Sequence, residues 1–207
     1  MSATPNPPHR RMNTAQQVTP ATVLGFWFGS EDEVDPRWFK RSGAFDQAIA
    51  QHFGAAVRAA LAGRLDAWSA QPDGALALVL LLDQFTRNMY RGTPAAFAGD
   101  VRALALARAL VDSGADLQLP PLRRWFAYMP LEHAEDAAVQ QQCVRLFEAL
   151  AGAAGPHREA LASALDYARR HRDVIVRFGR FPHRNAILGR ASSAEEKAFL
   201  LQPGSSF

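Results

Sequence analysis

The sequence predicts an all-α protein, a single domain of about eight or nine helices. Capping residues, prolines and glycines divide the chain into helix-length segments, and no segment shows the two-residue alternation of β-branched residues that is typical of strands. Alanine makes up 39 of the 207 residues, which favours helices that approach one another closely. A chain of this length is expected to bury one sizeable core.

Start and stop signals delimit the first four predicted helices, over residues 20–29, 42–63, 73–90 and 93–113. Thr19 precedes a proline at the first helical position of the first helix, and Ser42 can cap the second. The third helix contains the unbroken apolar run Ala75–Leu82, and a helix that is apolar on every side is a buried helix. Thr93 precedes the proline that opens the fourth, which ends before Gly114.

Prolines and a capping box delimit the other four predicted helices, over residues 120–129, 133–151, 156–179 and 193–203. Pro130 is expected to break the first of these, because a proline inside a helix removes a hydrogen bond. Ser193 and Glu196 match a capping box at the start of the last. Residues 1–17 are rich in proline and lack an apolar period, so we expect a disordered lead before one helical domain over residues 18–207.

The charge of the chain is concentrated in one segment. The net charge is +3 and the pI about 9.5, yet residues 169–190 alone carry +6 and the remainder carries −3. This segment contains no lysine, which argues against a broad nucleic-acid-binding surface. No apolar run is long enough to span a membrane, and the single cysteine, Cys143, excludes an intramolecular disulfide. Because no signal peptide is recognisable, we expect a cytoplasmic protein.

The first candidate site residues directly follow the apolar run: Asp83, Gln84, Arg87, Asn88 and Arg91. Asp83, Arg87 and Arg91 are four residues apart and share one helix face, and the two amides form an adjacent ridge. Polar groups that continue a buried helix need hydrogen-bonding partners. They form either a structural Asp83–Arg87 pair with helix caps, or the polar floor of a ligand pocket.

The second candidate group follows Pro130, where the sequence predicts the start of a helix. Glu135 and Asp136 are there favoured by the helix dipole. His133 is a candidate proton carrier, and a neighbouring carboxylate such as Glu135 would orient its ring. The spacing of His133 and Glu135 differs from the four-residue spacing of helical metal ligands, so no metal is expected.

The third group combines arginines with a histidine and an asparagine in a loop: Arg177, Arg180, His183, Arg184 and Asn185. Guanidinium groups bind carboxylate or phosphate through two parallel hydrogen bonds. These arginines either clamp a small anion or neutralise acidic residues of the protein itself. The preceding residues 169–172, which include His171, are expected to face solvent on one side.

Three sequence strings of these groups resemble the DUF924 family: residues 83–88, residues 130–135 and residues 177–190. This is an uncharacterised, mostly bacterial family, and the resemblance covers about residues 20–207. It implies an all-helical fold with TPR-like stacking of helix hairpins, and it implies no reaction. Thr86 stands where the family often has proline and Ala134 where it often has serine, and neither departure alters a charged residue.

Two functions are open from the sequence. In the first, the three groups converge on a small anionic ligand, which the three arginines clamp and to which His183 or His133 transfers a proton. No P-loop, G-x-S-x-G motif or nucleotide-binding loop is present, so hydrolysis or proton transfer fits better than redox chemistry, and no cofactor is expected. In the second, a TPR-like module binds a protein or an acidic peptide without catalysis. A third alternative is a buried polar network that only stabilises the fold.

Overall fold

The computed structural model describes residues 18–29, 33–153 and 155–205, and within them every regular element is helical. The α-helical segments are α1 (Pro20–Phe28), α2 (Gly43–Leu61), α3 (Pro72–Val79), α4 (Phe85–Met89), α5 (Asp100–Asp112), α6 (Pro121–Glu132), α7 (Ala137–Gly152), α8 (Arg158–Phe178) and α9 (Ala194–Leu200). A π-helical turn, Leu80–Gln84, joins α3 to α4 into one continuous helix. These described segments therefore form eight helices in one domain, and the predicted all-α class is confirmed. The disordered lead predicted for residues 1–17 lies outside the described residues.

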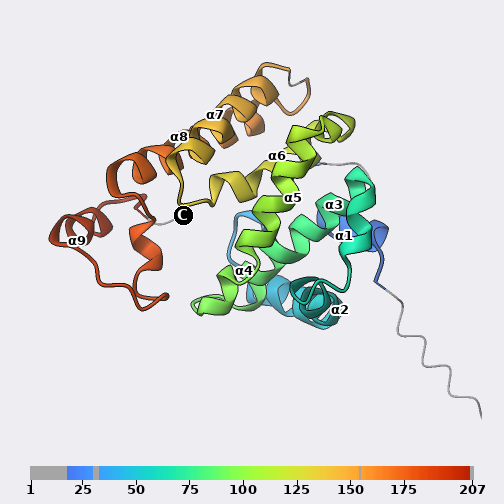
Figure 1. Cartoon of the computed structure of the whole chain (residues 1–207), viewed down its shortest axis with the longest axis horizontal. Helices are drawn as coiled ribbons and strands as arrows, with labels where there is room; N and C mark the ends of the chain where they lie inside the picture. The colour runs from blue at the N-terminus through green and yellow to red at the C-terminus, as the bar shows by residue number, and fades with distance from the viewer. Residues whose placement is uncertain (1–17, 30–32, 154, 206–207) are drawn as a thin grey trace, which may run out of the picture.

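Two groups of helices meet at α6. Figure 1 shows α1 to α5 packed together, with α7 lying along α8 on the other side of the molecule. α6 contacts α3 and α5 from the first group and α7 and α8 from the second. One apolar core runs through both groups, and every residue of the run Ala75–Leu82 is buried. TPR-like stacking of these hairpins stays a prediction.

The predicted helix caps are confirmed. The Thr19 hydroxyl accepts a hydrogen bond from the Thr22 backbone at the start of α1, and the Ser42 hydroxyl accepts one from Phe45 at the start of α2. Ser193 and Glu196 form the expected capping box at α9. The long helix α8 ends at Gly179, whose φ of 70° is the left-handed conformation that glycine adopts readily. Local sequence signals thus place these helix ends correctly.

The prediction that Pro130 breaks a helix is wrong. α6 passes through Pro130 and ends at Glu132, so the residues that follow close this helix instead of starting the next. The buried Gln140 amide donates hydrogen bonds to the carbonyls of Glu132 (2.6 Å) and Ala134 (2.9 Å). These bonds satisfy carbonyl groups at the helix end, and α7 begins only at Ala137, capped by Asp136.

The segment that begins at Thr93 also differs from its prediction. Pro94–Phe97 forms a short 3₁₀ helix, and the α-helix α5 starts only at Asp100. The chain turns at Gly99, where an added Cβ would lie 2.1 Å from the Leu82 carbonyl oxygen. This close backbone approach places Asp100 beside the polar end of α4. Within the described residues, no helix has the length and apolarity needed to cross a bilayer.

Candidate functional site

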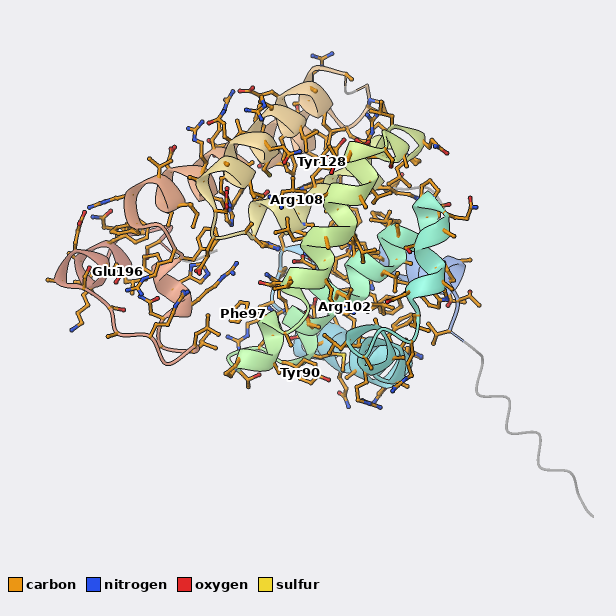
Figure 2. All side chains as sticks on the ribbon, in the orientation of Figure 1. Tyr90, Phe97, Arg102, Arg108, Tyr128 and Glu196 are labelled. Atoms are coloured by element: carbon orange, nitrogen blue, oxygen red, sulfur yellow. The ribbon has the colours of Figure 1, made fainter. Side chains whose placement is uncertain are left out.

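A cavity of about 870 Å³ lies where the two groups of helices meet. It is lined from α4, from the 3₁₀ segment before α5, from α6 and α8, and from the loop that follows α8. Figure 2 shows Phe97 on the side of the first group that faces the C-terminal loop. Seven predicted site residues line the cavity: Gln84, Arg87, Asn88, Arg91, His133, His183 and Arg184. Residues from all three predicted groups therefore converge on it.

Asp83 does not line the cavity, but it contacts Gln84, Arg87 and His133, which do. The side chain has no solvent exposure, and its carboxylate accepts hydrogen bonds from Gln84 (2.6 Å) and lies 3.1 Å from the Arg87 guanidinium. Burial raises the pKa of Asp83, but Arg87 and His133, together with the hydrogen bonds from His133 and Gln84, outweigh this effect and hold the pKa well below its usual range. The residue sits in the π-helical turn, a feature that is frequent at functional sites.

Asp83 also fixes the orientation of His133. The Nδ1 atom of His133 lies 2.7 Å from the Asp83 Oδ1 atom, and because the carboxylate is ionised, Nδ1 carries the proton and donates it. Burial and the nearby Arg87 guanidinium lower the pKa of His133, so the ring is neutral at pH 7. Its Nε2 atom is then a proton acceptor. Glu135 was predicted to orient a histidine, and for His133 this is wrong, since Asp83 orients it.

Asp100 joins the two arginines of the cavity. It accepts two hydrogen bonds from Arg87, at 2.8 and 3.1 Å, and a longer one of 3.4 Å from Arg184. The Arg184 guanidinium also lies 4.9 Å from the ring centroid of Phe97 and 4.6 Å from that of Phe181. Two cations therefore share one carboxylate against aromatic faces.

Arg184 is the less well neutralised of these two cations. Its side chain is buried, with the residue 6% exposed, and its Nε atom has no hydrogen-bond partner among the described residues. Burial and repulsion from Arg87 lower the pKa of Arg184 to about 10. Buried polar atoms are normally paired, so this unsatisfied donor is a departure from the usual pattern.

A buried carboxyl and a buried imidazole face the cavity beside His133. The Glu132 Oε1 atom lies 3.1 Å from the Nδ1 atom of His171, and the two rings of His133 and His171 are 6.2 Å apart. Burial and the Asp83 carboxylate raise the pKa of Glu132 to about 8, and burial lowers the pKa of His171 to about 3. At neutral pH the Glu132 carboxyl group is therefore protonated and the His171 ring is neutral, so the pair carries no net charge.

The prediction that Arg177, Arg180 and Arg184 together clamp an anion is wrong. Arg177 pairs with Glu195 at 2.8 Å on the surface, and Arg180 binds both carboxylate oxygens of Glu196, at 2.6 and 2.8 Å. Neither arginine lines the cavity. Only Arg184 faces it, and its partner guanidinium comes from Arg87 on another helix.

Glu135 and Asn185 hold the C-terminal loop and do not line the cavity. Glu135 accepts hydrogen bonds from Arg190 at 2.6 and 2.9 Å and from the Phe181 backbone at 2.8 Å. Asn185 is fully buried and accepts one from the Arg190 Nε atom at 3.0 Å. This loop carries His183 and Arg184. Glu135 and Asn185 therefore affect the cavity indirectly, by fixing the position of the loop.

Asn88 and Arg91 lie at the cavity but bind Asp46 of α2. The Asn88 amide donates to Asp46 at 2.7 Å, and the Arg91 Nε atom lies 2.6 Å from the same carboxylate. Their hydrogen bonds hold the end of α4 against α2. For Asn88 and Arg91 the structure therefore agrees with the predicted alternative of a structural role. The predicted Asp83–Arg87 ion pair is present. It is a structural pair, and its Arg87 side chain also lines the cavity.

Comparison with known proteins gives a family and a structural relative. The family described as bacterial protein of unknown function (DUF924) matches residues 23–204. The chain belongs to the DUF924 family. A solved structure of a protein of unknown function, ATU0120 from Agrobacterium tumefaciens, is similar to this chain, with 38% sequence identity and a TM-score of 0.78 over 88% of this chain and 96% of that chain. A comparison with curated proteins gives no match.

In this DUF924 protein, sequence reasoning did not select the aromatic and apolar lining of the cavity, and it missed the ring of Phe97 and the imidazole of His171. Arg169 and Arg170 are exposed, as expected for one side of this segment, and His171 lies on the buried side of the helix. A signal for it existed, because residues 161, 164, 168, 171 and 175 alternate spacings of three and four along one buried face of α8. No comparable signal marks Phe97, which depends on the turn at Gly99.

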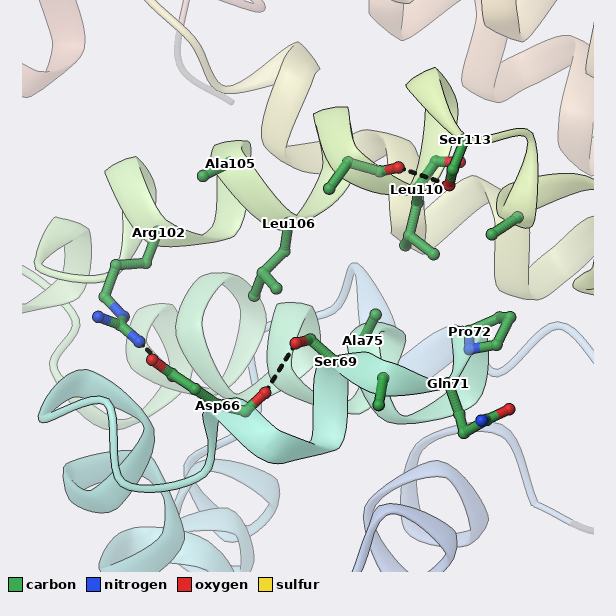
Figure 3. A pocket seen from close by; sticks show the side chains of 13 residues that line it. Asp66, Ser69, Gln71, Pro72, Ala75, Arg102, Ala105, Leu106, Leu110 and Ser113 are labelled. Carbon is green, nitrogen blue, oxygen red and sulfur yellow. Dashed lines mark hydrogen bonds and ion pairs between the residues drawn. The ribbon is translucent and has the colours of Figure 1, made fainter.

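A second cavity, of about 570 Å³, lies between α5 and the segment before α3. Figure 3 shows its two charged side chains, Asp66 and Arg102, paired with each other, and the rest of the labelled lining is mostly small or apolar. None of the predicted site residues lines it. The DUF924 motifs therefore single out the larger cavity as the candidate site.

The stability of the DUF924 domain is expected to be highest near pH 6.5. Above this pH the unfolded chain releases the proton that the folded Glu132–His171 pair retains, so the free energy of unfolding falls toward pH 8 by up to about 1.4 kcal/mol per pH unit. Below it the unfolded chain protonates His183, whose folded pKa burial and Arg184 lower to about 4, so stability falls again. Urea denaturation between pH 5 and 8 measures both slopes.

The variant Glu132→Gln separates the two slopes. Its amide does not titrate, so the decline between pH 6.5 and 8 is expected to vanish. The decline below pH 6.5 is expected to steepen, because the unfolded chain still protonates His171 and the folded pair no longer holds a compensating proton. A wild-type protein that is equally stable at pH 6.5 and pH 8 would contradict the assignment of the retained proton to this pair.

Proposed function

We propose that the cavity binds a small anionic ligand that bears a phosphate or a carboxylate, and that His133 exchanges a proton with it. One observation carries the proposal: the buried Arg184 guanidinium shares Asp100 with Arg87 and leaves its Nε atom without a partner. Burying a cation that is incompletely paired costs free energy. An anion at this position would supply the missing counter-charge and accept hydrogen bonds in the paired geometry that arginine favours.

The proposed proton exchange rests on the Asp83–His133 pair. A carboxylate that accepts the Nδ1 proton holds an imidazole in one tautomer and leaves Nε2 to act as a general base. The ring is neutral at pH 7 because its pKa is lowered, so it can accept a proton from a bound ligand. These features support proton transfer or hydrolysis on an anionic ligand.

The geometry favours a small ligand over the alternative of a peptide-binding module. A helical interaction module presents its contacts along an extended concave surface. Here the guanidinium groups of Arg87 and Arg184 and the imidazole of His133 face one cavity, whose volume of about 870 Å³ lies in the range of small-molecule sites. The surface arginines Arg177 and Arg180, which a peptide would meet, are paired with acids of the protein.

A thermal-shift series with inorganic phosphate and with phosphorylated and carboxylated metabolites tests this function. A ligand at a hundred times its Kd stabilises the folded state by about 2.7 kcal/mol, which corresponds to about 5 to 10 °C in Tm for a chain of this size. Arg184→Gln is expected to lose this response completely. Its own Tm is expected to equal or exceed that of wild type, because the substitution removes an incompletely paired buried cation.

Arg177→Gln is the matched control, since it removes a nearby arginine, in the last turn of α8, that pairs on the surface and lies outside the cavity. It is expected to respond to anions as wild type does. An equal response of the two variants, or no anion that shifts the wild-type Tm, would overturn the proposed site.

A further inference from the structure

The candidate cavity has an apolar end as well as a charged one. Trp125, Met129, Glu132 and His133 line it from one face of α6. A helix rises 1.5 Å per residue, so the backbone positions of Trp125 and His133 are about 12 Å apart along α6. The cavity wall therefore changes along this helix from an aromatic ring to the imidazole of the proposed proton exchange.

Helix α8 shows the same change. Ala164, Tyr167 and His171 line the cavity at spacings of three and four residues, which places them on one helix face. The ring of His171 lies 6.2 Å from that of His133, so both helices have their imidazoles at the charged end. Away from this contact, the lining residues of the two helices are apolar or aromatic, apart from Ser163.

An exposed aromatic ring extends the apolar end. Phe39 lines the cavity and stacks on Trp125, with centroids 5.1 Å apart and an angle of 20° between the rings, yet it is 57% exposed. Tyr167, which lines the same cavity, is also half-exposed. Large exposed rings around a cavity are typical of surfaces that an apolar group of a ligand covers.

We propose that the ligand is an amphipathic anion, with a carboxylate or phosphate head joined to an apolar body about 12 Å long. This rests on the proposed function, because Arg184 and Arg87 bind the head. The body extends along α6 and α8, over Met129, to the rings of Trp125 and Phe39. Both head groups carry negative charge and accept hydrogen bonds, and the choice between them is left to the experiment.

Isothermal titration calorimetry with two homologous series tests this proposal. The first series is straight-chain monocarboxylates of two, six and ten carbons, and the second is the matching monoalkyl phosphates. Each methylene that enters the cavity is expected to strengthen binding about threefold to fourfold, until the body reaches the end of the cavity. The matching alkanols, which lack the charge, are expected to bind at least about tenfold more weakly. The series with the lower Kd identifies the head group.

Two variants locate the apolar body. Phe39→Ala removes an exposed ring and is expected to weaken binding of the ten-carbon ligand at least about fivefold more than binding of the two-carbon ligand. Leu201→Ala removes another exposed apolar side chain, which is 88% exposed and does not line the cavity. It is expected to leave every Kd unchanged.

The outcomes separate this proposal from the proposed function. Equal affinity at all chain lengths, with binding still lost in Arg184→Gln, would overturn the amphipathic ligand and leave anion binding intact. Alkanols that bind as tightly as the carboxylates would overturn the assignment of the head to Arg184. If no acid or phosphate of any length binds, both the amphipathic ligand and the proposed function are wrong.

Discussion

Asp83→Asn is expected to destabilise the domain by about 3 to 5 kcal/mol, the usual effect of removing one partner from a buried ion pair. The carboxylate has no solvent exposure and accepts hydrogen bonds from Gln84 and His133 while it neutralises Arg87. An amide can accept at only one of its two positions, so at least one buried donor loses its partner. For a chain of this size the loss corresponds to a fall in Tm of about 6 to 20 °C.

Asp66→Asn is the matched control for this prediction. Asp66 pairs with Arg102, as Figure 3 shows, but its side chain is 61% exposed. Exposed pairs contribute about 0 to 1 kcal/mol, so this variant is expected to unfold close to wild type. Equal stabilities of the Asp83 and Asp66 variants would show that the buried carboxylate does not hold the polar end of the cavity together.

Asp83→Asn also tests the proton exchange assigned to His133. A bound anion raises the pKa of this histidine, so wild type is expected to take up protons when a ligand binds near pH 7. Without the ionised carboxylate, the imidazolium is less stable and the uptake is expected to fall. Calorimetric titrations in two buffers of different ionisation enthalpy measure it. Unchanged uptake would assign the proton to another group.

Gly99→Ala is expected to destabilise the domain by about 3 kcal/mol, at the upper end of overpacking effects. The new methyl group would lie 2.1 Å from the Leu82 carbonyl oxygen, and a backbone atom inside a buried helix cannot move aside as a flexible side chain can. The displaced segment begins α5 at Asp100, which accepts hydrogen bonds from Arg87 and Arg184. Anion affinity is therefore expected to fall together with stability.

Gly25→Ala gives the opposite expectation for the same chemical change. Gly25 lies in the middle of α1 and is exposed, and an added Cβ meets no atom within 4 Å. The substitution is expected to stabilise the domain by up to about 1 kcal/mol, because alanine loses less backbone entropy in a helix. Urea denaturation of the two variants checks both signs. A Gly99→Ala protein that is as stable as wild type would contradict the close backbone approach.

Much of the fold could be predicted because its signals are local. The hydroxyls of Thr19, Ser42 and Ser193 bond to backbone groups three residues ahead, so a cap is visible in the sequence itself. The exceptions depended on distant partners. Pro130 stays helical where α7 supplies Gln140 to the carbonyls at the end of α6, and α5 starts late because Gly99 packs against Leu82.

The candidate site could be predicted only in part for the same reason. The motifs that contain Arg87, His133 and Arg184 were recognisable as unusual, and these residues do line one cavity. The Asp83 partner of Arg87 was predicted correctly. The partners of His133 and Arg184 were not, since proximity in sequence favoured Glu135 for His133 and grouped Arg184 with Arg177 and Arg180. Phe39 and Phe97 had no sequence signal, because they lie in short 3₁₀ segments and turns.

The sequence by itself determined the helical class and most helix ends, and its charged motifs identified the family to which the chain belongs. These properties depend on hydrogen bonds and side-chain spacings within a few residues. Only the tertiary structure decided which charges neutralise each other and which face the cavity. His133 meets Asp83 across 50 residues and Arg184 meets Asp100 across 84, whereas Arg177 and Arg180 find carboxylates at the nearby start of α9. Ion pairs over such separations form only when helix packing brings the elements together, so the incomplete pairing of Arg184 is a property of the fold.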